Sequence, residues 1–223
     1  MNMKLLLEAL LKFSLGIILV GLLIFLPAGT IHYWNGILLM CILFVPMFIA
    51  GIIMLIKSPR LLESRLNLNE KEQTQKEVVK LSGLMFCLGF IVAGLNYRYS
   101  WIELPNIVVY ISSIIFIISY ILYGEVLKEN AYLARTIEVS NNQKLIDTGL
   151  YKIVRHPMYT VTLLLFLSMP LILNSLLSFI IFLMYPFIII KRINNEEKVL
   201  ESKLKGYKEY KRKVKYKLIP FVW

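Results

Sequence analysis

The sequence carries little charge and almost no cysteine. Charged residues make up 17% of its 223 residues and hydrophobic residues 58%, whereas soluble domains contain about 25% charged residues. A soluble globular domain or a disordered chain is therefore a poor fit. The two cysteines, Cys41 and Cys87, lie in separate apolar stretches, which excludes a disulfide framework and a CxxC metal site. The sequence also lacks a P-loop, a GxGxxG motif and a serine nucleophile elbow.

Long apolar stretches indicate a polytopic membrane protein instead. A bilayer core about 30 Å thick needs about 20 apolar residues in a helix. In the first half of the chain four segments meet this requirement: Leu15–Leu26 together with the preceding Met3–Phe13, Gly36–Ile56, Val78–Leu95 and Ile107–Tyr123. A signal peptide is the alternative for the first of them, but no small-residue cleavage site follows it and further spans do.

A fifth apolar stretch, Val161–Ile190, contains 30 residues without a charge. As a single helix it would measure about 45 Å, which is more than a bilayer core requires. Pro170 and Asn174-Ser175 interrupt it near the middle. We therefore expect a short helical hairpin that supplies spans five and six.

The basic residues indicate how these spans are oriented, because cytoplasmic loops carry an excess of Lys and Arg. Every Lys and Arg except Arg98 falls into one of four segments, 1–12, 57–80, 128–155 and 191–217. Six spans with both termini in the cytoplasm place all four segments on the cytoplasmic side.

The predicted fold is thus all-α, a polytopic integral membrane bundle of about six spans with cytoplasmic N- and C-termini. We divide it into residues 1–127, four spans with a cytoplasmic loop at 57–80, and residues 128–223. The second region holds a loop, the helical hairpin at 157–190 and a basic tail.

The loop at 57–80 and the residues that follow the first span are predicted to have structural roles. The loop at 57–80 is mixed in charge, so we expect a solvated connector that is helical in parts. His32, Tyr33 and Trp34 follow the first span, and we interpret all three as anchors at the membrane interface.

The net charge of +11 is concentrated beside the membrane. Lys205–Lys217 contains seven basic residues and one acidic residue, interleaved with Tyr207, Tyr210 and Tyr216. Such a stretch is attracted to anionic lipid headgroups. Nucleic-acid binding is the alternative, and the position of the stretch next to a membrane hairpin disfavours it.

The segment that precedes the hairpin is the first candidate for chemistry. Alternating Ile137 and Val139 predict a small hairpin or an extended loop. Pro157 suits the first turn of a helix, so His156 should lie at the N-terminal end of the fifth span. A helix N-terminus attracts anions, and Arg155 would strengthen that attraction. The alternative for His156 is a simple capping residue.

The segment that follows the hairpin, Lys191–Leu204, is the second candidate. Arg192 and Glu196 are four residues apart and share one helix face. The hairpin returns them to the membrane face of His156. We therefore predict one polar cluster of Arg155, His156, Tyr159, Arg192, Glu196 and Glu197. The alternatives are membrane anchors for the arginines and a solvated, ion-paired face for the glutamates.

The motifs of these segments stand in a fixed order. Gly149-x-Tyr151-x-x-x-Arg155-His156-Pro157-x-Tyr159 precedes the apolar hairpin, and Arg192-x-x-x-Glu196-Glu197 follows it. Gly206-Tyr207-x-x-Tyr210-x-x-x-Val214 and Ile219-Pro220 complete the series. This order resembles the isoprenylcysteine carboxyl methyltransferase family, in its bacterial-type members, and more loosely the phospholipid N-methyltransferases. The resemblance covers about residues 136–223, whereas the first four spans match only in hydropathy and number.

The resemblance implies S-adenosylmethionine as methyl donor, a lipid-like acceptor from the bilayer, and a site that faces the cytoplasm, in this case of a bacterial membrane. It implies no metal. The residues it assigns to the cofactor are Glu138, Gln143, Lys144, Leu145, Ile146, Tyr151, Arg155, His156, Pro157, Met158, Tyr159 and Glu196. It assigns catalysis to Arg192, which would face the acceptor, and we add Glu197. Leu150 departs from the family, where many members have proline.

The chemistry suits these assignments. A carboxylate acceptor is ionised at pH 7 and needs no general base, and the planar guanidinium of Arg192 can orient it. An amine acceptor would need a base, for which His156 or Glu197 are the candidates. Two other functions stay open at this point, a membrane-embedded NADPH-dependent reductase of the sterol-reductase type and a non-catalytic scaffold.

Overall fold

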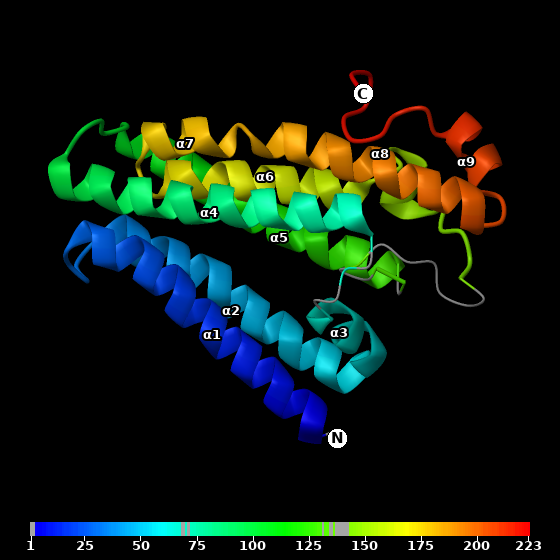
Figure 1. The fold of residues 1–223 in the computed structure, drawn as a ribbon, viewed down its shortest axis with the longest axis horizontal. Coiled ribbons are helices and arrows are strands. Elements are labelled where there is room, and N and C mark those ends of the chain that lie inside the picture. The colour runs from blue at the N-terminus through cyan, green and yellow to red at the C-terminus, as the bar shows by residue number, and fades with distance from the viewer. Residues whose placement is uncertain (1–2, 68–69, 71, 131, 134–135, 137–142) are drawn as a thin grey trace.

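The computed structural model describes residues 3–67, 70, 72–130, 132–133, 136 and 143–223 (Figure 1). Its helices are α1 Met3–Ala28, α2 Trp34–Lys57, α3 Pro59–Leu66, α4 Gln73–Tyr99, α5 Asn106–Glu129, the 3₁₀ turn η1 Gly149–Lys152, α6 Pro157–Ile172, α7 Leu176–Phe182, α8 Tyr185–Lys203 and α9 Tyr207–Lys213. The described residues contain no strand. The predicted all-α membrane bundle is confirmed.

Among the described residues, five helical segments are long and apolar enough to cross a membrane. They are α1, α2, α4, α5 and the continuous pair α7–α8, which spans Leu176–Lys203. The expected fifth span, α6, has only 16 residues and is about 24 Å long. The described residues therefore supply five helical segments long enough to cross a bilayer and one apolar helix that is shorter than a bilayer core.

The predicted hairpin is present, and its turn lies at Leu173–Ser175. Asn174 adopts a positive φ of 55° there, and the Ser175 side chain accepts a hydrogen bond from the Ser178 N–H to start α7. Pro170 was expected to interrupt the stretch, but it lies inside α6. The Asn174-Ser175 pair therefore makes the turn, and Pro170 only precedes it.

The helices form two groups, as Figure 1 shows. Helices α4, α5, α6 and α7–α8 pack together, while α1 and α2 run side by side and diverge from them toward the N-terminus, where α3 lies. Helices α1 and α4 meet at the opposite end, where Gly94 permits a close approach. A Cβ at Gly94 would lie 2.5 Å from the carbonyl oxygen of Ile24.

Two predictions for the connecting segments were wrong. Tyr33 is not an interfacial anchor, because it is buried, stacks on Tyr97 and donates a hydrogen bond to the carbonyl of Leu173. The loop at 57–80 is helical in part, as predicted, since it contains α3, but this part is not a solvated connector, because Leu61 and Leu62 are buried. Trp34 is exposed, as an anchor would be. Apolar residues on one face of the loop explain the second error.

The contact between α4 and α7 generates a stability prediction. A Cβ at Gly89 would lie 2.2 Å from the ring of Phe182, which packs edge-on against Phe86 with centroids 5.3 Å apart. Gly89→Ala should therefore lower the free energy of unfolding by about 1–3 kcal/mol. Thermal unfolding in detergent measures the change.

Gly83 provides the matched control for this substitution. It lies on the same helix with nothing within 4 Å of an added Cβ. Gly83→Ala should leave stability unchanged or raise it by up to about 1 kcal/mol. Equal midpoints for the two variants would show that Phe182 does not fix the spacing of α4 and α7.

Candidate active site

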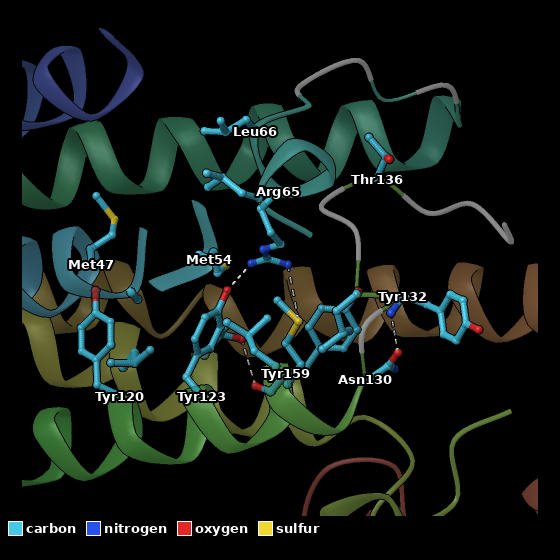
Figure 2. A pocket seen from close by; sticks show the side chains of 18 of the residues that line it. Met47, Met54, Arg65, Leu66, Tyr120, Tyr123, Asn130, Tyr132, Thr136 and Tyr159 are labelled. Atoms are coloured by element: carbon cyan, nitrogen blue, oxygen red, sulfur yellow. Dashed lines mark hydrogen bonds between the residues drawn. The ribbon is translucent and has the colours of Figure 1, made fainter. Parts of the chain in front are cut away.

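A cavity of about 1140 Å³ opens at the end of the bundle that carries α3, residues 143–146 and α9, and it continues between the helix groups. Figure 2 shows Met47 and Tyr120 at one end of this cavity and Asn130 and Tyr132 at the other. We call these ends the apolar arm and the polar arm.

The apolar arm lies between α1, α2, α4, α5 and α6. Its lining includes Phe13, Leu43, Pro46, Met47, Phe48, Phe86, Ile117, Tyr120, Ile121 and Phe166. The polar arm includes Asn130, Tyr132, Thr136, Gln143, Lys144, Leu145, Ile146, Tyr151, Arg155, His156, Tyr159, Arg192, Glu196, Tyr207 and Tyr210. A single cavity is therefore lined by polar residues in one part and by apolar residues in the other.

Arg155, just before α6, makes three side-chain hydrogen bonds to other described residues. It is 6% exposed, and its Nε donates to Glu197 Oε1 at 2.6 Å. Its Nη1 donates to the carbonyls of Val214 and Lys215 at 2.7 and 2.8 Å. One guanidinium thus ties α6 to α8 and to the C-terminal tail.

The carboxylate of Glu197 is surrounded by nitrogen atoms. Besides Arg155, it has His156 Nε2 at 3.4 Å, Lys217 Nζ at 3.6 Å and Lys211 Nζ at 3.7 Å. Glu197 is 4% exposed and does not line the cavity. Glu197 is therefore a buried carboxylate that stabilises the fold through its ion pairs.

The tail also covers the start of α6. The N–H groups of Arg155 and His156 donate to the carbonyls of Tyr216 and Lys217, both at 2.9 Å. Thr160 Oγ1 donates to the carbonyl of Leu218 at 2.7 Å. Carbonyl oxygens of the tail therefore occupy the end of α6 that the sequence suggested for an anion.

The side chain of His156 does not cap α6, so the alternative of a simple capping residue is wrong. His156 precedes α6 as expected, but its side chain makes no capping hydrogen bond. Its ring instead stacks on Tyr159 with centroids 5.7 Å apart and lines the cavity.

A chain of three polar side chains crosses the cavity wall. Arg192 Nε donates to the Tyr159 hydroxyl at 2.8 Å, and that hydroxyl donates to Glu196 Oε2. The Arg192 guanidinium also lies over the Tyr159 ring, 5.7 Å from its centroid. Arg192 and Glu196 share a face of α8, as their spacing predicted, and Tyr159 of α6 bridges them.

Helix α9 closes the polar arm. Tyr207 and Tyr210 are buried and line the cavity, and the Tyr210 hydroxyl donates to the carbonyl of Tyr151 at 2.8 Å. Leu204 and Val214 pack with them. The sequence had placed these tyrosines in a lipid-binding tail, although their helical spacing could have indicated a buried face.

The structure brings most of the predicted site residues together. Those that line the cavity are Gln143, Lys144, Leu145, Ile146, Tyr151, Arg155, His156, Met158, Tyr159, Arg192 and Glu196. Pro157 and Glu197 lie beside it without lining it. Glu138 and the loop predicted at Ile137–Val139 fall outside the described residues.

Sequence analysis missed the residues that enter the site from other elements. Arg65 of α3 and Tyr123 of α5 lie where the two arms meet, and Arg65 donates to the Tyr123 hydroxyl (Figure 2). Asn130 donates from Nδ2 to the Tyr151 hydroxyl at 3.0 Å. Arg65, Tyr123 and Asn130 lie outside the motif segments, so only the tertiary fold shows that they belong to the site.

Comparison with known proteins adds one match. Residues 113–202 match the model of the Isoprenylcysteine carboxyl methyltransferase (ICMT) family. This range runs from the middle of α5 to the end of α8 and contains the motifs from Gly149 to Glu197. None of the curated proteins matches the chain.

The Arg155–Glu197 pair generates a stability prediction. Removing one partner of a buried pair leaves the other charge uncompensated and costs about 3–5 kcal/mol. Arg155→Gln and Glu197→Gln should each lower the free energy of unfolding by about that amount. Arg155→Lys should also destabilise, because an ammonium group cannot reproduce the geometry of the guanidinium fork. Unfolding in detergent, followed by circular dichroism, measures these changes.

Glu201→Gln is the control, since its partner Lys211 is 41% exposed and such surface pairs contribute at most about 1 kcal/mol. If Arg155→Gln is as stable as Glu201→Gln, the pair does not hold the tail against α6 and α8.

Proposed function

Because residues 113–202 match the model of the isoprenylcysteine carboxyl methyltransferase family, we propose that the chain is a membrane methyltransferase that uses S-adenosylmethionine and methylates the carboxylate of an apolar acceptor. The donor would occupy the polar arm and the acceptor the apolar arm. The observation that carries the proposal is that one cavity joins both arms beside the Arg192–Tyr159–Glu196 chain.

The residues of the polar arm fit S-adenosylmethionine. The Tyr207 hydroxyl is buried and makes no hydrogen bond to the described residues. Burial raises its pKa, so it stays a neutral donor. The N–H groups of Lys144, Leu145 and Ile146 also make no hydrogen bond to the described residues. A buried hydroxyl normally has a partner, and the bound donor would supply one to Tyr207. The N–H groups of residues 144–146, which are exposed or half-buried, would be further hydrogen-bond donors to S-adenosylmethionine.

Glu196 supplies the negative charge of this arm and would bind the amino group or ribose hydroxyls of the donor. When bound, S-adenosylmethionine supplies an electrophilic methyl group on a sulfonium. The side chains that we propose to contact it are Gln143, Lys144, Leu145, Ile146, Tyr151, His156, Met158, Tyr159, Glu196 and Tyr207. The main work of the protein is then to position two reactants.

Arg192 would orient the acceptor carboxylate, because its guanidinium lines the cavity where Tyr159 separates the arms. We propose a positioning role, not a catalytic one, for Glu197 and Arg155, which hold α6, α8 and the tail in register. Glu197 is held by Arg155 outside the cavity wall, so it is poorly placed as a general base. This placement removes Glu197 as the base that an amine acceptor would need and leaves His156, which lines the cavity, as the other candidate.

The distribution of basic residues supports an orientation with the polar arm toward the cytoplasm. The charged side chains of α9, with Lys208, Lys211, Arg212 and Lys213, would then meet the anionic headgroups of that leaflet. The apolar arm would receive the acceptor from the bilayer.

Calorimetry on the purified protein in detergent tests the cofactor. S-adenosylmethionine should bind and NADPH should not. Glu196→Gln should weaken binding of the donor about tenfold or more, because it removes a charge-assisted contact of about 1.5–3 kcal/mol. NADPH binding without binding of S-adenosylmethionine would favour a reductase instead, and a folded protein that binds neither would favour a scaffold.

The Tyr207 hydroxyl provides a sharper test of the donor pose. Tyr207→Phe should weaken binding of S-adenosylmethionine about three- to tenfold, the worth of one neutral hydrogen bond. It should not destabilise the free protein, because the hydroxyl makes no hydrogen bond to the described residues. Isothermal titration and thermal unfolding measure the two effects.

Tyr210→Phe is the matched control, since its hydroxyl is bonded to the Tyr151 carbonyl. It should lower stability by about 0.5–1.5 kcal/mol and leave donor affinity within about twofold. Unchanged donor affinity in Tyr207→Phe would remove Tyr207 from the donor site.

A further inference from the structure

The charge that lines the cavity is mostly of one sign. Among the described residues, the lysine, arginine and acidic side chains that line it are Lys12, Arg65, Lys144, Arg155, Arg192 and Glu196. Two of the arginines have carboxylates nearby, since Arg155 is paired with Glu197 and Arg192 connects to Glu196 through Tyr159. The cavity is therefore a basic environment in which these two charges are already compensated.

Arg65 differs from both of these arginines. Its guanidinium donates to the Tyr123 hydroxyl and lies over the Tyr123 ring at 5.6 Å from the centroid. Its other contact is Met158 Sδ at 3.8 Å. Within the part of the chain that the structure describes, Arg65 has no carboxylate partner. All of its partners are neutral.

The structure fixes Arg65 in this position. Buried Leu61 and Leu62 hold α3 on the bundle. At the C-terminal end of α3, Lys12 of α1 donates to the carbonyl of Leu66 at 2.7 Å. Figure 2 shows the side chain of Arg65 directed from α3 toward Tyr123, with Tyr159 close by. Arg65 thus lies at the junction of the two arms, half-buried.

A half-buried guanidinium with only neutral partners is costly, because its charge has lost water without gaining a counter-charge. The ring and hydroxyl of Tyr123 offset only part of that cost. An anion at the same place would complete the site through charge-assisted hydrogen bonds. The apolar arm beside it would accept the tail of an amphiphile.

We propose that Arg65 binds the anionic group of the methyl acceptor and makes the enzyme selective for anionic amphiphiles over neutral ones. This inference rests on the proposed function, which places the acceptor in the apolar arm. A methyl ester carries no charge, so a methylated carboxylate loses its attraction to Arg65. The same residue would therefore favour binding of substrate over retention of product.

The test compares two probes that differ in one charge, N-acetyl-S-farnesylcysteine and its primary amide, with the protein in nanodiscs and without S-adenosylmethionine. Wild type should bind the carboxylate about tenfold or more tightly than the amide. Arg65→Gln should reduce that preference to less than about threefold. Arg65→Lys should keep part of it, because the charge is retained.

Arg60→Gln is the matched control. Arg60 lies on the same helix, is exposed and does not line the cavity, so this variant makes the same change in net charge and should keep the wild-type preference. Binding of S-adenosylmethionine, measured separately, should stay within about twofold in all variants, and their thermal midpoints report folding.

A wild-type preference that survives intact in Arg65→Gln would overturn the proposal and assign acceptor recognition to Arg192 alone. A wild type that binds both probes equally would overturn it as well. A wild type that does not bind S-adenosylmethionine would count against the proposed function instead. The two results are independent, because the two probes are compared without S-adenosylmethionine.

Discussion

The buried ion pair between Arg155 and Glu197 is the interaction on which the polar arm depends. Arg155 precedes α6 and Glu197 lies on α8, and the same guanidinium holds the carbonyls of Val214 and Lys215. A buried charge needs a partner and further hydrogen bonds to be tolerated, and this arrangement provides both. It places the tail against α6, and the tail in turn follows α9, whose tyrosines close the cavity. Arg155, in the cavity wall, and Glu197, behind it, thus hold the polar arm in place.

Much of the fold could be predicted from the sequence because membrane spans depend on local composition. The apolar stretches give α1, α2, α4 and α5 within a few residues, and Asn174-Ser175 marks the hairpin turn. The errors concern tertiary contacts. Tyr33 has the composition of an interfacial anchor, but its hydroxyl reaches the hairpin turn 140 residues away. Helix α3 is short and charged, so hydropathy alone gave no reason to bring it to the cavity.

The site shows the same division. The motif spacing predicted that Arg192 and Glu196 share a face, and they do, but it could not separate Glu196 from Glu197. Adjacent helical residues point about 100° apart, so one carboxylate lines the cavity and the other is buried against Arg155. Which of the two does so depends on how α8 is rotated against α6. Arg65 and the unbonded Tyr207 hydroxyl depend likewise on contacts between elements far apart in the sequence.

The first turn of α6 is where the two halves of the proposed chemistry meet. Met158 and Tyr159 are neighbours in the chain, and each contacts an arginine from a different helix group: Met158 contacts Arg65 of α3 and Tyr159 contacts Arg192 of α8. An acceptor carboxylate at this turn would therefore lie near cations from both groups, although α1–α3 lie outside the matched range 113–202. The donor side can then be common to the family while the α3 side sets which amphiphile enters.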